Sequence, residues 1–260
     1  MAGVLLHWAM GDPEKLDPEN SEYSPSCKKA YALGLLLPDI AKQGLIGGEA
    51  EFNRFFEGCS ASDIPTWGEY LRFCETHHFN PDPRDPSRQD TRNPDLAAFL
   101  RAGYTDLKKP VWQGAFCHLM GDKAFYYRSY CVDEARAMED FRREVGAFEA
   151  WDAEKWRNSE TGRLWYDDYN VLNTRVEAAY GVLERACRLL PASLLRELLA
   201  AFRVEFSSGR AEPKYMNLES IKRYIALSRQ LCRRIKAGEA EEVLRLFDGD
   251  HPDAFFQAPQ

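Results

Sequence analysis

The chain has 260 residues, of which 45% are hydrophobic, 29% charged and 13% aromatic, as is typical of a globular protein with a full hydrophobic core. Its formal net charge of −7 argues against nucleic-acid or anionic-membrane binding through surface charge. No apolar run approaches the roughly 20 residues that span a bilayer. We therefore expect a single domain over residues 1–260, with no membrane span and no nucleic-acid partner.

The cysteines and the N-terminal segment indicate the cellular compartment in which the protein is found. The seven cysteines are odd in number and scattered, and no CxxC pair occurs, which favours reduced thiols over a disulfide framework. The segment from Met1 to His7 has no basic region, and its apolar stretch is too short for a secretory signal. These features predict a cytoplasmic protein.

Helical periodicity begins with residues 26–42, a leucine-rich stretch that predicts a buried helix. Pro38 interrupts it, because proline inside a helix removes a hydrogen bond and clashes with the preceding turn. A helix that stops or kinks at Leu37 places Asp39 close to a helix end.

The remaining periodic segments also predict helices, at 50–57, 67–76, 94–103, 111–128, 132–157, 165–189, 191–207, 216–236 and 238–247. Asn217 is a good N-cap for the helix 216–236, and Gly238 suits the position after its last turn. No alternation of apolar and polar residues supports more than an incidental strand. The predicted fold class is therefore all-α, a single compact multi-helix domain.

Two segments are predicted to lie outside the helices. Residues 80–93 contain three prolines and almost no apolar residue, which predicts a polar loop. Residues 248–260 are turn-rich and predict a loosely held tail.

The most informative local pattern is His118 followed by Asp122. The i, i+4 spacing places both side chains on one helix face, where an imidazole nitrogen and a carboxylate oxygen can bind one cation. The alternative is a histidine that is simply hydrogen-bonded to an aspartate within a half-buried helix.

Four further residues are candidate metal ligands, and each of them also has a purely structural interpretation. His77 and His78 are adjacent, so their side chains diverge by about 100° on a helix and do not serve the same ion. Asp39 follows an apolar helix, where it is either an N-cap or a metal ligand, because an unpaired buried carboxylate is costly. His7 lies in an apolar patch, where it is either a metal ligand or a core histidine whose hydrogen bonds are satisfied within the protein.

Taken in order, four segments resemble the zinc-dependent phospholipase C family, which is related to the single-strand-specific zinc nucleases. The segments are LLHW at 5–8, GLLLPDI at 34–40, THHFNPD at 76–82 and GAFCHLMGD at 114–122. The resemblance covers roughly residues 1–128, with a weaker similarity at 164–173. It implies a compact helical bundle with zinc ions at the base of a cleft.

The resemblance also implies roles for individual residues. Asp39, His78, His118 and Asp122 would bind one zinc ion, and Asp122 would bridge to a second zinc that His7 also binds. Asp39 or Asp122 would orient the attacking water.

One zinc site of the family is missing, because no histidine occurs between His118 and His251. Arg128 stands near its first position and is a candidate phosphate-binding cation. Asp168 and Asn173, in an aromatic-rich helix start, are candidate substrate contacts, with solvation or capping of the helix as the alternative.

Two functions follow from these residues. The first is a metal-dependent hydrolase that acts on a small phosphoester through a metal-activated water. The second is a non-catalytic helical binding or scaffold protein with a structural or vestigial metal site. One or two zinc ions are the expected cofactor, although manganese or iron also suits imidazole and carboxylate ligands.

Overall fold

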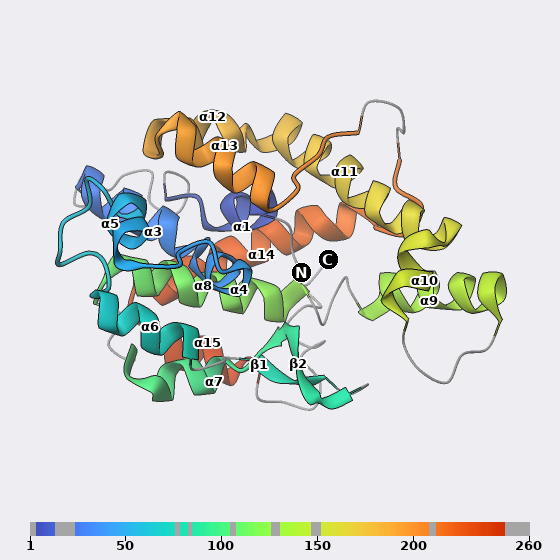
Figure 1. The fold of residues 1–260 in the computed structure, drawn as a ribbon, viewed down its shortest axis with the longest axis horizontal. Helices are drawn as coiled ribbons and strands as arrows, with labels where there is room; N and C mark the ends of the chain where they lie inside the picture. Colours follow the sequence, from blue (N-terminus) through green and yellow to red (C-terminus); the bar gives the residue numbers. More distant parts are fainter. Residues whose placement is uncertain are drawn as a thin grey trace.

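A computed structural model shows the chain as an assembly of packed helices (Figure 1). It describes residues 4–13, 24–75, 79–82, 85–104, 108–125, 131–146, 152–207 and 212–247. These residues form fourteen α-helices, one short π-helix and a single two-stranded sheet, so the predicted all-α fold class is confirmed. Within the same residues, no helix is both long enough and apolar enough to cross a membrane.

Among the described residues, the first half of the chain supplies seven α-helices and the short π-helix. They are α1 (Val4–Gly11), α3 (Pro25–Gly34), α4 (Leu37–Gln43), α5 (Glu49–Phe55), α6 (Trp67–Glu75), α7 (Leu96–Phe99), the π-helix (Leu100–Tyr104) and α8 (Pro110–Phe125). The second half supplies α9 (Cys131–Val145), α10 (Ala153–Asn158), α11 (Glu160–Tyr180), α12 (Val182–Leu189), α13 (Ala192–Ala201), α14 (Leu218–Lys236) and α15 (Ala240–Arg245).

Several helix ends lie where the sequence predicts them. The Asn217 side chain caps α14 by accepting the backbone N–H of Ser220 at 3.0 Å, and Gly238 follows that helix with a φ of 90°. The predicted helix 165–189 is instead two helices, because Gly181 adopts a φ of 55° between α11 and α12. The predicted helix 132–157 is likewise divided, and α9 ends just before Gly146, whose φ is 81°.

The prediction of a loop over residues 80–93 is wrong. Strands β1 (Phe79–Asp82) and β2 (Asp85–Pro94) pair antiparallel there, with an irregular register. Backbone pairing needs no apolar side chains, and both strands of a two-stranded sheet are edge strands, where proline is tolerated. The predicted loose tail at 248–260 lies outside the described residues.

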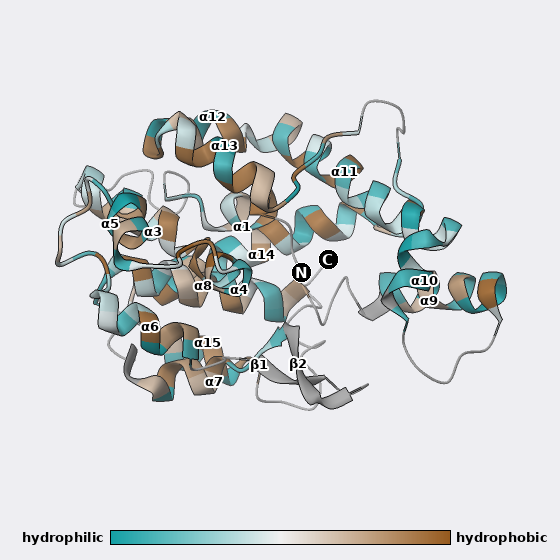
Figure 2. Cartoon of the chain, viewed as in Figure 1, coloured by the Kyte–Doolittle hydropathy of each residue, from teal (hydrophilic) through white to brown (hydrophobic). Residues whose placement is uncertain are grey.

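Helix α8 is the central element of the fold. It packs against α1, α3, α4, α7, α14 and the β2 strand, and all but two of its 16 residues are buried. Figure 2 shows hydrophobic residues on the segments around α3, α4 and α8, and hydrophilic residues along much of α11. A helix that is apolar on all sides must be enclosed by others, which explains the position of α8.

Two glycines allow α3 and α8 to touch backbone to backbone. A Cβ atom added to Gly34 would collide with the carbonyl group of Val111, and one added to Gly114 would collide with the carbonyl oxygen of Tyr31. Backbone atoms cannot move aside as a flexible side chain can. Both positions therefore require glycine for this packing distance.

We expect Gly34→Ala to lower the free energy of unfolding by about 1–3 kcal/mol, because the added methyl group forces the two backbones apart. Denaturant unfolding followed by circular dichroism measures the change. Gly68→Ala is the matched control, since Gly68 is helical with open space around it and alanine there adds about 0.5–1 kcal/mol of stability. An unchanged or higher stability for Gly34→Ala would contradict the close helix packing.

Candidate metal centre

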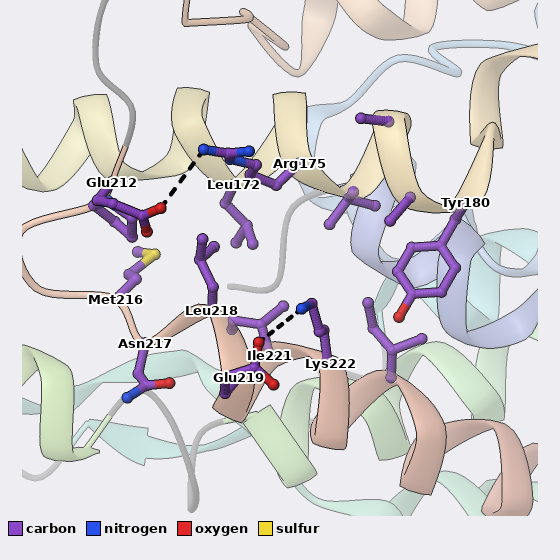
Figure 3. Close-up of a pocket in the computed structure, with 15 residues that line it drawn as sticks. Leu172, Arg175, Tyr180, Glu212, Met216, Asn217, Leu218, Glu219, Ile221 and Lys222 are labelled. Atoms are coloured by element: carbon purple, nitrogen blue, oxygen red, sulfur yellow. Dashed lines mark hydrogen bonds and ion pairs between the residues drawn. The ribbon is translucent and has the colours of Figure 1, made fainter.

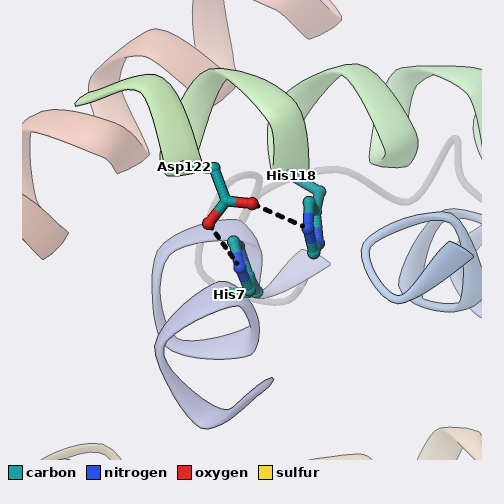
Figure 4. Close-up of side chains that lie close together, drawn as sticks. All are labelled: His7, His118 and Asp122. Carbon is teal, nitrogen blue, oxygen red and sulfur yellow. Dashed lines mark ion pairs between the residues drawn. The ribbon is translucent and has the colours of Figure 1, made fainter. Parts of the chain in front are cut away.

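Three buried side chains from two helices meet at one point in the core (Figure 4). His7 comes from α1, whereas His118 and Asp122 come from successive turns of α8. One ligand atom from each residue lies within 4.8 Å of the other two, and the residues are 0%, 1% and 3% exposed, respectively. The structure thus brings together three of the five metal ligands that the sequence predicts, and this group could bind a metal ion.

The distances within the cluster suit a small cation. Nε2 of His7 lies 3.3 Å from Oδ1 of Asp122, and Nε2 of His118 lies 3.3 Å from Oδ2 of the same carboxylate. Ligands at 2.0–2.2 Å from a tetrahedral zinc ion are about 3.3–3.6 Å apart. The two nitrogens approach different oxygens of Asp122, so one oxygen must turn towards both nitrogens to share an ion with them. The two imidazole rings stack with centroids 3.6 Å apart at an angle of 13°. Because nitrogen lone pairs lie in the ring planes, the rings must tilt apart to direct both nitrogens at one ion.

A backbone carbonyl orients the His118 ring. Nδ1 of His118 lies 2.7 Å from the carbonyl oxygen of Leu35, in the turn that separates α3 from α4. A carbonyl oxygen can only accept a hydrogen bond, so Nδ1 carries the proton. In a neutral ring Nε2 then bears the lone pair and faces Asp122, which is how histidine ligands of metals are usually held.

The His7 ring has no such partner. Both of its nitrogens are buried and without a hydrogen-bond partner among the described residues, although Nε2 lies beside Asp122. A buried polar atom without a hydrogen bond is costly, typically by about 1–3 kcal/mol. A bound metal ion would satisfy one of these nitrogens, so the residues present fit a metal.

Burial and mutual charges shift the pKa values of all three residues of the cluster. Burial and the neighbouring His118 lower the pKa of His7. Burial would also lower the pKa of His118, but the charges of Asp39 and Asp122 outweigh it, so this pKa is raised. Burial opposes ionisation of Asp122, yet the two imidazoles hold its pKa well below the usual value. Either a proton on His118 or a metal ion can supply the positive charge.

Asp39 lies beside the cluster but outside the three-residue group. It is 5% exposed in the first turn of α4, and its Oδ1 atom is 3.9 Å from Nε2 of His118. The N-cap of α4 is Leu36, so the interpretation of Asp39 as an N-cap is wrong. The position instead places a carboxylate near the positive end of a short helix and near a candidate cation.

The other predicted site residues are not part of the cluster. His78 and Arg128 lie outside the described residues, so their roles stay predictions. The buried Asp168 carboxylate accepts backbone N–H groups of residues 214, 215 and 216 at 2.6–3.0 Å. The amide of Asn173 donates to the carbonyl oxygen of Glu205 at 3.1 Å. Both contacts connect α11 to the segments before and after residues 208–211.

Two residues near the cluster could not be named from the sequence. The Leu35 carbonyl can accept a hydrogen bond from His118 because the chain turns before Pro38. That turn was the only local feature of the sequence that pointed to this contact. The buried Tyr224 phenol on α14 donates to the carbonyl oxygen of Gly121 at 3.0 Å. Burial and the charge of Asp122 raise the pKa of Tyr224 well above its usual value. No sequence pattern pairs α14 with α8.

No protein-family model, no curated protein and no solved structure matches this chain. The fold and the cluster together define an all-α protein with a candidate metal centre in its core.

We expect a chelator to lower the melting temperature of the wild-type protein, because ligands assembled only in the folded chain link metal binding to folding. Metal at about 100 times its Kd adds about 2.7 kcal/mol, or roughly 5–10 °C in a chain of this size. His118→Ala should show no chelator response. Cys117→Ala, which changes the neighbouring buried residue outside the group, should respond like wild type. Equal responses in wild type and His118→Ala would exclude the site.

Near Asp168, burial raises the pKa of Asp133 to about 6, and the Asp168 charge adds to the rise. Because this pKa is higher in the folded state than in the unfolded chain, Asp133 stabilises the fold at low pH, and that contribution disappears as the pH rises from about 4 to about 6. Asp133→Asn should therefore be more stable than wild type at pH 7.5, by up to about 3 kcal/mol. Urea unfolding at several pH values tests this. The two proteins should converge below about pH 4.

Proposed function

We propose that this chain is a metal-dependent hydrolase of phosphoesters, with zinc or another divalent cation held by His7, His118 and Asp122. One observation carries the proposal, namely that imidazole nitrogens from α1 and α8 approach the two oxygens of one buried carboxylate. Three protein ligands are the number that catalytic zinc sites use, since they leave one position for water or substrate. A zinc ion in such a site lowers the pKa of water and polarises a phosphoryl oxygen.

The residues of the chain have separate parts in this reaction. His7, His118 and Asp122 hold the cation, and the Leu35 carbonyl keeps His118 in the ligating tautomer. Asp39 lies close to this group without belonging to it, at 3.9 Å from Nε2 of His118. We assign to Asp39 the orientation of the attacking water and the acceptance of its proton.

The substrate class rests on the resemblance to the zinc-dependent phospholipase C family. The segments at 5–8, 34–40 and 114–122 contain His7, Asp39, His118 and Asp122. The resemblance divides the ligands between two ions, whereas His7, His118 and Asp122 form one group within 4.8 Å. We therefore propose one ion at this group. A second ion would require His78 or other residues beyond those described.

A non-catalytic role is the second candidate, and the burial of the site favours it. All four residues are at most 5% exposed, and none of them lines the cleft between α11 and α14 (Figure 3). If Asp39 moves in as a fourth ligand, the site becomes a closed four-coordinate site, which is typical of structural zinc. The protein would then be a helical scaffold with a metal that stabilises the fold.

We expect Asp39→Asn to separate these functions. If Asp39 acts on water, the variant keeps one metal ion per chain and loses about 10²–10⁴-fold in kcat on a phosphodiester substrate. Elemental analysis and turnover on a panel of phosphomonoesters and phosphodiesters provide the two measurements. Asp167→Asn, on the partly exposed side of α11, is the matched control and should change neither value.

Three results would overturn the proposed hydrolase activity. Wild-type protein with stoichiometric metal but no turnover on the panel would establish the structural role. Loss of the metal from Asp39→Asn would show that Asp39 closes the coordination sphere. A wild-type protein purified without added metal that neither contains nor binds zinc, manganese or iron would exclude both functions.

A further inference from the structure

Two helices far apart in the sequence supply the candidate metal ligands, so the position of one helix against the other decides whether the ligands meet. His7 lies on α1, whereas His118 and Asp122 lie on α8 (Figure 4). The two stacked imidazole rings must also tilt apart to direct both nitrogens at one ion. A displacement of α1 against α8 therefore changes the distances between the ligand atoms directly.

Helix α14 carries none of the candidate ligands, yet it packs against both of these helices (Figure 1). The hydroxyl of its buried Tyr224 donates a hydrogen bond to the carbonyl oxygen of Gly121 on α8 at 3.0 Å. The same hydroxyl oxygen lies 3.3 Å from the sulfur of Met10 on α1. The hydroxyl has a single proton, which the carbonyl oxygen accepts because a thioether sulfur is the weaker acceptor. One phenol thus touches both ligand-bearing helices.

These contacts lie next to the ligands along each helix. Gly121 directly precedes Asp122 on α8. Met10 follows His7 by three residues, which places it on the same side of α1, about one turn further on. A change in either contact is therefore transmitted to a ligand through no more than one turn of helix.

The space between the three helices is closely filled at this point. A Cβ atom added to Gly121 would collide with the terminal methyl group and the sulfur of Met10, and it would lie 3.1 Å from the Tyr224 hydroxyl oxygen. The Met10 and Tyr224 side chains thus occupy the position that a side chain on α8 would take. Both residues are 0% exposed, so bulk water does not compete for the hydrogen bond.

Helix α14 makes a second polar contact with α1. Nε of Arg229 donates to the carbonyl oxygen of Ala9, in the last turn of α1, at 2.8 Å. Carbonyl groups in the last turn of a helix have no partner within it, and a cation there is favoured by the helix dipole. The Arg229 guanidinium also lies 4.9 Å from the centre of the Tyr180 ring. Of the two α14 contacts with α1, the one made by Tyr224 also reaches α8.

We propose that Tyr224 is a positioning residue for the metal centre, whose hydroxyl fixes α1 against α8 and thereby raises the affinity of the three ligands for the cation. It acts through the Gly121 carbonyl and the Met10 side chain and is not itself a ligand. The inference rests on the metal binding of the proposed function, but not on hydrolysis. The alternative is a tyrosine that stabilises the packing of three helices and leaves metal affinity unchanged.

Competition for zinc between the full chain and a chromophoric chelator gives the Kd of the wild-type protein and of Tyr224→Phe. The variant removes one oxygen atom and keeps the ring, which packs against Phe125 with the ring centroids 5.3 Å apart. We expect the Kd of Tyr224→Phe to be about 10–100-fold higher, which is the usual cost of losing an outer contact that orients metal ligands.

Tyr215→Phe is the matched control. Tyr215 is 3% exposed, and its hydroxyl donates to Asp140 on α9 at 3.0 Å, away from the ligand-bearing helices. This variant loses a tyrosine hydrogen bond of the same length and should bind zinc like wild type. Urea unfolding with excess chelator measures the stability that each metal-free variant loses, so that a change in affinity is separated from a change in stability.

Cobalt provides a readout of geometry, because the visible absorption bands of Co²⁺ depend on the number and arrangement of its ligands. At saturating cobalt we expect Tyr224→Phe to have shifted bands and Tyr215→Phe to have the wild-type spectrum. A wild-type Kd or a wild-type cobalt spectrum for Tyr224→Phe would overturn the inference, as would an equal loss of affinity in Tyr215→Phe.

Failure of the proposed hydrolysis gives a different result. Wild-type protein that binds zinc without turnover excludes the hydrolase, whereas a raised Kd for Tyr224→Phe still supports the positioning role. Wild-type protein that binds neither zinc nor cobalt would overturn both.

Discussion

The backbone contact between α3 and α8 is the constraint on which the candidate site depends. Gly34 and Gly114 permit an approach that any side chain would prevent. At this distance the carbonyl group of Leu35, the residue that follows the end of α3, reaches Nδ1 of His118. A wider spacing would leave the imidazole without its proton acceptor and free to rotate. The glycines thus influence the candidate site through the orientation of one ring.

The second requirement of the candidate site is a balance of charge around the buried Asp122 carboxylate. Asp122 is almost fully buried, and a buried carboxylate persists only if it is paired and hydrogen-bonded. Two imidazoles lie beside this carboxylate; burial and His118 lower the pKa of His7, whereas Asp39 and Asp122 raise that of His118 against the effect of burial. Asp39 adds another negative group at the edge of the cluster. The balance of two carboxylates against two stacked imidazoles favours the entry of a cation.

The two halves of the chain differ in how their charged groups are placed. The candidate metal centre lies around α8, whose residues are almost all buried, so that solvent is excluded and electrostatic interactions are strong. The cleft between α11 and α14 is lined by apolar side chains and by two exposed ion pairs. Asp168 contributes to that cleft indirectly, because it fixes the backbone of residues 214–216, next to its lining. This carboxylate has a clear role in holding the segment that leads into α14.

Local sequence patterns were sufficient for the helical class, for the ends of α14 and for the placing of His118 and Asp122 on one helix face, because helical periodicity and the i, i+4 spacing depend only on nearby residues. They missed the breaks within the predicted helices 132–157 and 165–189. They were insufficient for the hairpin at 79–94, where backbone pairing needs no side-chain pattern. The resemblance had placed His7 with Asp122 at a second ion, and only the tertiary structure showed that His7, His118 and Asp122 form one group and that Asp168 binds backbone amides. Such convergence depends on how helices pack, and packing is determined by the shapes of many side chains together.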